Sequence, residues 1–125
     1  MARILIIDDE TPLRSVIAQT LTAVGHTIFE AADGRLGLER LSVEPVDLVI
    51  TDLVMPEQDG IETISVLRHL HPGLPIIAMS GDPRHTVLCL EIATRLGVRR
   101  ALVKPFSADA LLHAVDEALE RIRAA

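Results

Sequence analysis

Three carboxylates, one hydroxyl and one ammonium stand at the ends of short apolar runs: Asp8, Asp9, Asp52, Ser80 and Lys104. Carboxylates brought close together repel each other. A hard divalent cation with oxygen ligands removes this repulsion and keeps coordination sites open for phosphate oxygens, and Mg²⁺ fits such a set better than Zn²⁺. In-line phosphoryl transfer depends mainly on positioning and on positive charge at the equatorial oxygens, which Mg²⁺ and Lys104 would supply. An ordinary carboxylate needs no activating base at pH 7, so Asp52 could act as the nucleophile without one.

These side chains can meet only if the apolar runs are parallel strands that end at one rim. The run Leu48 to Ile50 has no polar alternation, which suits a strand buried on both faces of a parallel sheet. In open α/β sheets, ligands bind at the carboxyl ends of the strands. The expected strands are Arg3 to Ile7, Thr27 to Ala31, a central strand from Leu48 ending on Asp52, Leu74 to Met79, and Ala101 to Val103.

Helices are predicted between these strands from capping and stop signals. Thr11 is expected to cap the first helix, with Pro12 at its first position and Gly25 at its end. Asp33 and Ser107 are expected to cap the second and the last helix. The other predicted helices run from Asp33 to about Leu41, from about Ile61 to Leu70, from Arg84 to Leu96, and from Ser107 along Leu111, Val115, Leu119 and Ile122. Strands that alternate with helices imply right-handed crossovers and a parallel sheet covered on both faces.

Composition excludes several classes of function. The 125 residues suit one domain, and we expect it to span residues 1–125. A net charge of −6 argues against direct binding of nucleic acid. The longest stretch without charge, Ser15 to Phe29, is too short and too polar to span a bilayer, and no signal peptide precedes it. Cys89 is the single cysteine, which predicts no internal disulfide and a cytoplasmic location.

With these residues assembled, the chain resembles the receiver domains of two-component response regulators, the family of the chemotaxis regulator. The matching segments are DDE at Asp8 to Glu10, the strand into Asp52, MPEQDG at Met55 to Gly60, Ser80, and KPF at Lys104 to Phe106. The resemblance implies a flavodoxin-like (βα)5 three-layer sandwich, with a parallel five-stranded sheet of order 2-1-3-4-5.

The resemblance also implies the roles of the site residues. Asp52 would accept a phosphoryl group from a phosphohistidine on a sensor histidine kinase or phosphotransfer protein. Ser80 would hydrogen-bond one phosphoryl oxygen, Lys104 would pair with another, and the Lys104 to Pro105 peptide bond would be cis. The Mg²⁺ ligands would be Asp9 and Asp52 directly, Asp8 through water, and the Val54 carbonyl. The protein would not be an enzyme, but a phospho-acceptor that supports its own Mg-dependent phosphorylation and dephosphorylation.

One position departs from the family pattern. Ala101 stands three residues before Lys104, where many members have an aromatic residue that reports the state of the hydroxyl. We therefore hypothesise that the loop Gly81 to Arg84 and the helix after it carry the output. Apolar residues surround more of that helix than one buried stripe requires. The face of helix Arg84 to Leu96 is thus an expected surface for a downstream effector protein or a homodimer.

Alternatives from other classes stay open at the level of sequence. A haloacid-type phosphatase uses a strand-end Asp with Mg²⁺, but needs an Asp where this chain has Val54. A flavodoxin-like flavin carrier would need a Ser/Thr-rich loop where this chain is acidic, and a degenerate receiver would lack part of the acidic, hydroxyl and ammonium set. The chain could also be a receiver excised from a larger regulator, for example a DNA-binding one, although its size favours a free-standing form.

Overall fold

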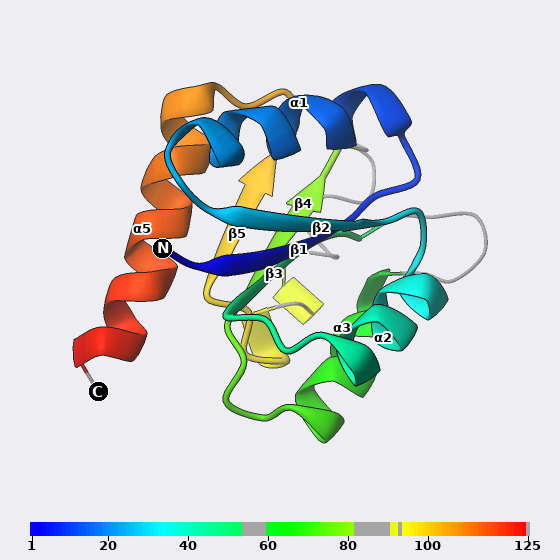
Figure 1. The fold of residues 1–125 in the computed structure, drawn as a ribbon. Coiled ribbons are helices and arrows are strands. Elements are labelled where there is room, and N and C mark those ends of the chain that lie inside the picture. The colour runs from blue at the N-terminus through cyan, green and yellow to red at the C-terminus, as the bar shows by residue number, and fades with distance from the viewer. Residues whose placement is uncertain (54–59, 82–90, 93, 125) are drawn as a thin grey trace.

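Five parallel strands form one sheet in the computed structural model, which describes residues 1–53, 60–81, 91–92 and 94–124 (Figure 1). The strand order is β2-β1-β3-β4-β5, which confirms the predicted topology. The strands are β1 (Arg3–Ile7), β2 (Thr27–Ala31), β3 (Leu48–Asp52), β4 (Ile76–Ser80) and β5 (Arg100–Val103). The helices whose two ends lie in the described residues are α1 (Thr11–Ala23), α2 (Gly34–Val43), α3 (Gly60–Leu70) and α5 (Ala108–Ala124).

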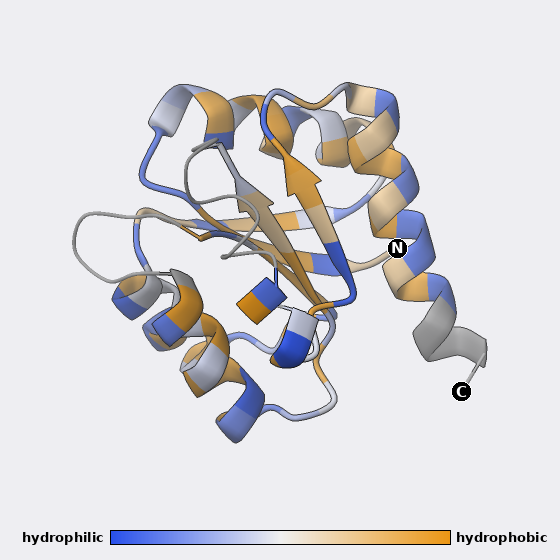
Figure 2. Cartoon of the chain, turned by 180° about the vertical axis from the view of Figure 1, so that it is seen from behind, coloured by the Kyte–Doolittle hydropathy of each residue, from blue (hydrophilic) through white to orange (hydrophobic). Residues whose placement is uncertain are grey.

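Helices cover both faces of the sheet, as Figure 1 shows, and each face has its own apolar core. Because successive residues of a strand point to opposite faces, Ile4 and Ile6 pack under α1 and α5, whereas Leu5 and Ile7 pack under α2 and α3. Every residue of β3 and β4 is buried. The strands are largely apolar, while the helices mix apolar and polar residues (Figure 2). The inner strands are therefore fixed in register by burial on both sides.

The register brings the carboxyl ends of the inner strands to one rim. Asp52 of β3 pairs with Met79 of β4, and Ser80 pairs with Val103 of β5. Backbone bonds extend this alignment past the strands, since the Lys104 N–H donates to the Ser80 carbonyl oxygen at 2.8 Å. The Asp8 N–H likewise donates to the carbonyl oxygen of Ala31 at 3.1 Å. The sheet thus holds Asp52 and Ser80 as the last residues of their strands. It holds Asp8 and Lys104 through backbone hydrogen bonds one residue past the ends of β1 and β5.

Two of the three predicted caps are confirmed. The Asp33 carboxylate accepts from the Leu36 N–H at 2.8 Å, and the Ser107 hydroxyl oxygen accepts from the Ala110 N–H at 3.0 Å. The prediction for Thr11 is wrong, because Glu10 occupies the N-cap position of α1 and Thr11 is already helical. The Glu10 side chain makes no capping hydrogen bond. This carboxylate is directed to the site instead of to the helix.

Smaller differences have local causes. β4 begins at Ile76 and not at Leu74, since the Leu74 N–H closes a turn on the His71 carbonyl oxygen. Of the helix expected over Arg84 to Leu96, residues 91, 92, 94 and 95 are helical, and Gly97 follows with a φ of +85°, as a helix stop requires. The rest of that helix, the loop after Gly81, Cys89 and the segment 54–59 lie outside the described residues. None of the helices in the described part of the chain has the length and apolar character needed to cross a membrane.

Candidate functional site

The Lys104 ammonium is surrounded by three carboxylates. Its Nζ lies 3.0 Å from Asp52 Oδ2, 3.3 Å from Asp8 Oδ2 and 3.5 Å from Glu10 Oε1. Asp8 is fully buried, and Asp52 is 4% exposed. A buried carboxylate needs a partner charge or hydrogen bonds, and Lys104 gives both aspartates that partner. These groups come from positions far apart in the sequence, so the fold alone brings them together.

Asp8 is held at the end of β1 by hydrogen bonds to its carboxylate and to its carbonyl oxygen. Its Oδ1 accepts from the Glu10 N–H at 2.9 Å, and its carbonyl oxygen accepts from Arg14 Nη1 at 2.6 Å. Arg14 also pairs with Glu30 of β2, Nε to Oε1, at 3.1 Å. Burial raises the pKa of Asp8, and the nearby Asp52 carboxylate adds to this, although the Glu10 N–H and the Lys104 charge oppose it. The ionised form of Asp8 is therefore costly unless positive charge is close by.

Lys104 is held by a backbone hydrogen bond to Ser80 and by the close approach of Gly81 to its side chain. Its peptide bond to Pro105 is cis, as the resemblance predicted. Gly81 lies against the stem, because a Cβ at that position would stand 3.2 Å from Lys104 Cδ. Burial lowers the pKa of Lys104, but the hydrogen bond and charge of Asp52, with Asp8 and Glu10, outweigh it and raise the pKa above its usual value. Lys104 is therefore a positively charged ammonium at neutral pH.

The other sequence-predicted residues lie in different surroundings. Ser80 is fully buried at the end of β4, next to Lys104 along the rim. Asp9 is exposed and does not belong to the group of clustered carboxylates in the described part of the chain. Val54 lies outside the described residues, so its carbonyl remains a prediction.

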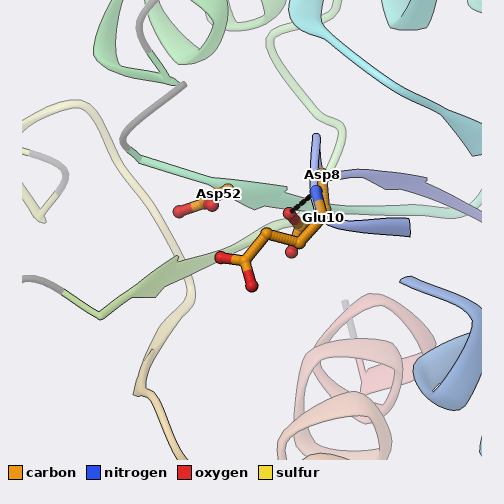
Figure 3. Close-up of side chains that lie close together, drawn as sticks. All are labelled: Asp8, Glu10 and Asp52. Atoms are coloured by element: carbon orange, nitrogen blue, oxygen red, sulfur yellow. Dashed lines mark hydrogen bonds between the residues drawn. The ribbon is translucent and has the colours of Figure 1, made fainter. Parts of the chain in front are cut away.

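Glu10 is the member of the cluster that sequence reasoning missed as a site residue. Ligand oxygens of Asp8, Glu10 and Asp52 all lie within 4.8 Å of one another, and Figure 3 shows the three side chains gathered at the rim. Three such oxygens suit a hard divalent cation such as Mg²⁺, which takes few protein carboxylates and keeps room for other oxygen ligands. The donor set therefore fits the expected cation.

A pocket of about 590 Å³ opens beside these charges. Asp52, Lys104 and Glu10 supply the charged side chains of its lining, next to Gly81. The rest of its lining is apolar: Leu13, Pro105 and Phe106. A phosphoryl group entering the pocket would meet the Asp52 carboxylate and the Lys104 ammonium together. The arrangement can thus bring a nucleophile, Asp52, and a positive charge, Lys104, to the same phosphoryl group.

Comparisons with known proteins agree with this geometry. The family model described as "Response regulator receiver domain" matches residues 4–116. The transcriptional regulatory protein GlrR of Escherichia coli K12 is 37% identical over 120 residues, which are 96% of this chain and 27% of that protein. This chain thus spans about a quarter of the length of GlrR.

Two solved structures have a similar fold over nearly the whole chain. NtrX from Brucella abortus is 30% identical and superposes with a TM-score of 0.92, covering 98% of this chain and 28% of that one. The chemotaxis protein CheY4 of Vibrio cholerae is 28% identical with a TM-score of 0.85, and covers 95% of this chain and 99% of that one. The likeness therefore extends over nearly the entire chain.

Proposed function

This chain belongs to the response regulator receiver domain family, and we propose that its Asp52 accepts a phosphoryl group from a phosphohistidine. The donor would be a sensor histidine kinase or a phosphotransfer protein. Receiver domains partner with histidine kinases, and the acidic pocket at the rim of the sheet is the place where this chain would meet the phosphohistidine. The whole of residues 1–125 would act as one receiver domain in the cytoplasm, either alone or within a larger regulator.

The contact between Lys104 and Asp52 is the observation that carries this proposal. A buried carboxylate at the end of the central strand has an ammonium at 3.0 Å and an accessible pocket beside it. In the reaction, one Asp52 oxygen forms a bond to phosphorus, and the bond from phosphorus to the histidine nitrogen breaks. The electron pair of that bond stays on the imidazole ring. The product on Asp52 is an acyl phosphate, which water later hydrolyses.

Asp9 and Asp52, with the carbonyl of Val54, are the proposed direct ligands of Mg²⁺, and Asp8 would act through water. Glu10, which clusters with Asp8 and Asp52, adds negative charge beside this set. When bound, the cation would supply positive charge to the phosphoryl oxygens and neutralise the carboxylates. Lys104 would turn its ammonium from the carboxylate to a phosphoryl oxygen, and the Ser80 hydroxyl would donate to another. The backbone bond between Lys104 and Ser80 keeps these two residues at adjacent positions on the rim. Positioning and charge are the main demands of this reaction, and these side chains are suited to meet them.

The output would be a change in protein contacts that follows phosphorylation. A downstream effector protein is the expected partner, and the acidic chain is not expected to bind nucleic acid directly. The helix face Arg84 to Leu96, expected from the sequence to bind an effector or a second copy, lies mostly outside the described residues and stays a hypothesis.

Intact-mass spectrometry after incubation with acetyl phosphate tests the proposed function. We expect the wild-type protein to gain the mass of one phosphoryl group with Mg²⁺ present and to gain none in EDTA. The Asp52→Asn variant should gain none under either condition. The modified protein should lose its phosphate in base, as an acyl phosphate does. Equal uptake by wild type and Asp52→Asn would contradict the proposal.

A further inference from the structure

Glu10 is the exposed member of the carboxylate cluster. Its side chain is 61% exposed, whereas those of Asp8 and Asp52 are buried. Glu10 occupies the N-cap position of α1 without a capping side-chain bond, and its Oε1 lies 3.5 Å from Lys104 Nζ. It also lines the pocket beside Asp52. The Glu10 carboxylate therefore faces both the charged centre and the space through which a phosphodonor enters.

The charge of the cluster shows what this third carboxylate changes. Asp8 and Asp52 together with the Lys104 ammonium leave one net negative charge, and Glu10 makes this two. A divalent cation gains from every negative charge near its ligands. A phosphodonor carries negative charge itself, so the same carboxylate repels it. Glu10 adds this charge without being the acceptor of the phosphoryl group.

We propose that Glu10 sets the charge balance of the pocket, so that its carboxylate strengthens cation binding and slows the capture of anionic phosphodonors. This inference rests on the proposed function of the site. Because Glu10 is largely exposed, its effect is moderate, and dissolved salt screens it. Glu10 thus acts through its charge: it changes the affinity for the cation and the rate at which the donor is captured, and it takes no part in the bond that forms.

The Glu10→Gln variant tests the proposal because it removes the charge and keeps the size of the side chain. Isothermal titration calorimetry with MgCl₂ alone measures cation affinity, since the chain has no Trp or Tyr for intrinsic fluorescence. We expect the Mg²⁺ dissociation constant to rise by about three- to tenfold at low ionic strength. Glu120→Gln is the matched control, because Glu120 is an exposed carboxylate on α5 outside the pocket. It should bind Mg²⁺ as the wild type does.

The second measurement is the initial rate of phosphate uptake at saturating Mg²⁺. With acetyl phosphate, Glu10→Gln should react about three- to tenfold faster than wild type. The gain should be smaller with phosphoramidate, which carries less net negative charge. Both the affinity change and the rate change should shrink at high salt, which a merely structural role of Glu10 would not produce. Wild-type values in either measurement, or changes that persist at high salt, would overturn the proposal.

The two measurements also separate this inference from the proposed function. If wild type takes up no phosphate, the proposed function fails, while calorimetry still shows whether Glu10 supports cation binding. If wild type takes up phosphate and Glu10→Gln behaves identically in both measurements, only the inference about Glu10 fails.

Discussion

Lys104 Nζ lies 3.0 Å from Asp52 Oδ2 and 3.3 Å from Asp8 Oδ2, so one ammonium serves two carboxylates from two other strand ends. The Lys104 side chain is 14% exposed, which leaves little water to replace it as a partner. In the structure Lys104 therefore neutralises part of the negative charge that Mg²⁺ would neutralise in the proposed reaction. Removal of the ammonium should affect both stability and phosphoryl transfer.

Lys104→Met should destabilise the protein in Mg²⁺-free buffer by roughly 3 kcal/mol, because it leaves two buried carboxylates without their cation. Addition of Mg²⁺ should restore part of this loss, since the cation takes over the neutralisation. Urea unfolding followed by circular dichroism measures both effects. Phosphate uptake should fall as well.

Arg100→Met is the control for Lys104→Met, because it removes an ion pair that is not buried. Arg100 pairs with Glu117 at 2.7 Å, but both side chains are about half exposed. Its loss should cost less than about 1 kcal/mol. If the two variants were equally stable, the account of Lys104 as a buried partner would be wrong.

Asp8→Asn should stabilise the Mg²⁺-free protein at pH 7. Burial raises the folded-state pKa of Asp8 above that of the unfolded chain, so the folded protein holds this proton more tightly. Wild-type stability therefore falls as pH rises through the folded pKa, and Asn, which carries no charge, avoids this loss.

The gain of Asp8→Asn should shrink as the pH is lowered through the folded pKa, where wild-type Asp8 is itself protonated. Unfolding curves over a series of pH values measure the difference. The same variant should bind Mg²⁺ more weakly, because a ligand charge is lost. A variant that is less stable than wild type at neutral pH would contradict this prediction.

Gly81→Ala should slow phosphate uptake severalfold and leave stability nearly unchanged. The added Cβ would stand 3.2 Å from Lys104 Cδ, so the flexible lysine stem must shift. A small displacement of a group that orients the phosphoryl oxygens reduces the rate. Gly73→Ala is the matched control, since its Cβ would meet nothing within 4 Å. Equal uptake by both variants would show that the close approach to Lys104 has no functional effect.

Arg68→Met should lower the free energy of unfolding by about 2–3 kcal/mol. The Arg68 guanidinium donates to four backbone carbonyl oxygens at 2.8–3.0 Å, which belong to Pro72, Leu74, Leu96 and Gly97. These contacts tie the end of α3 to the loop before β4 and to the turn before β5. Denaturant unfolding of Arg68→Met measures the loss.

Arg95→Met provides the comparison for Arg68, because Arg95 is an exposed arginine just before the same turn. We expect its stability to stay within about 0.5 kcal/mol of wild type. Arg68→Lys should fall between the two, since an ammonium cannot reach four carbonyls with the geometry of a guanidinium. An Arg68→Met variant as stable as Arg95→Met would show that the four hydrogen bonds of Arg68 do not stabilise the fold.

Much of the fold could be predicted because buried strands and helix caps are recognised from short stretches of sequence. β1 and β2 have the predicted bounds, and the central strand ends on Asp52 as expected. Asp33 and Ser107 cap their helices because each has a backbone N–H three residues later to bind. Such patterns depend on neighbouring residues only, so they can be interpreted without knowledge of the tertiary structure.

The features that were missed depend on contacts across the sheet. Glu10 precedes a helix, where an acidic residue commonly caps the helix, but its side chain makes no capping bond and pairs with Lys104 at 3.5 Å instead. Its place in the acidic DDE run was the one available signal. The guanidiniums of Arg3 and Arg40 lie over the ring of Phe29, at 5.3 and 5.1 Å from its centre, and no local pattern predicts these contacts.

A crystal structure with Mg²⁺ and beryllium fluoride, a mimic of the phosphoryl group, would show whether Asp52 is the acceptor and Lys104 its partner in the reaction. We expect the mimic on Asp52, a cation held by Asp52 together with the acidic residues that follow β1, and the Lys104 ammonium on a fluorine atom of the mimic. A mimic bound elsewhere, or Lys104 still paired with Asp52 and turned from the mimic, would contradict this expectation.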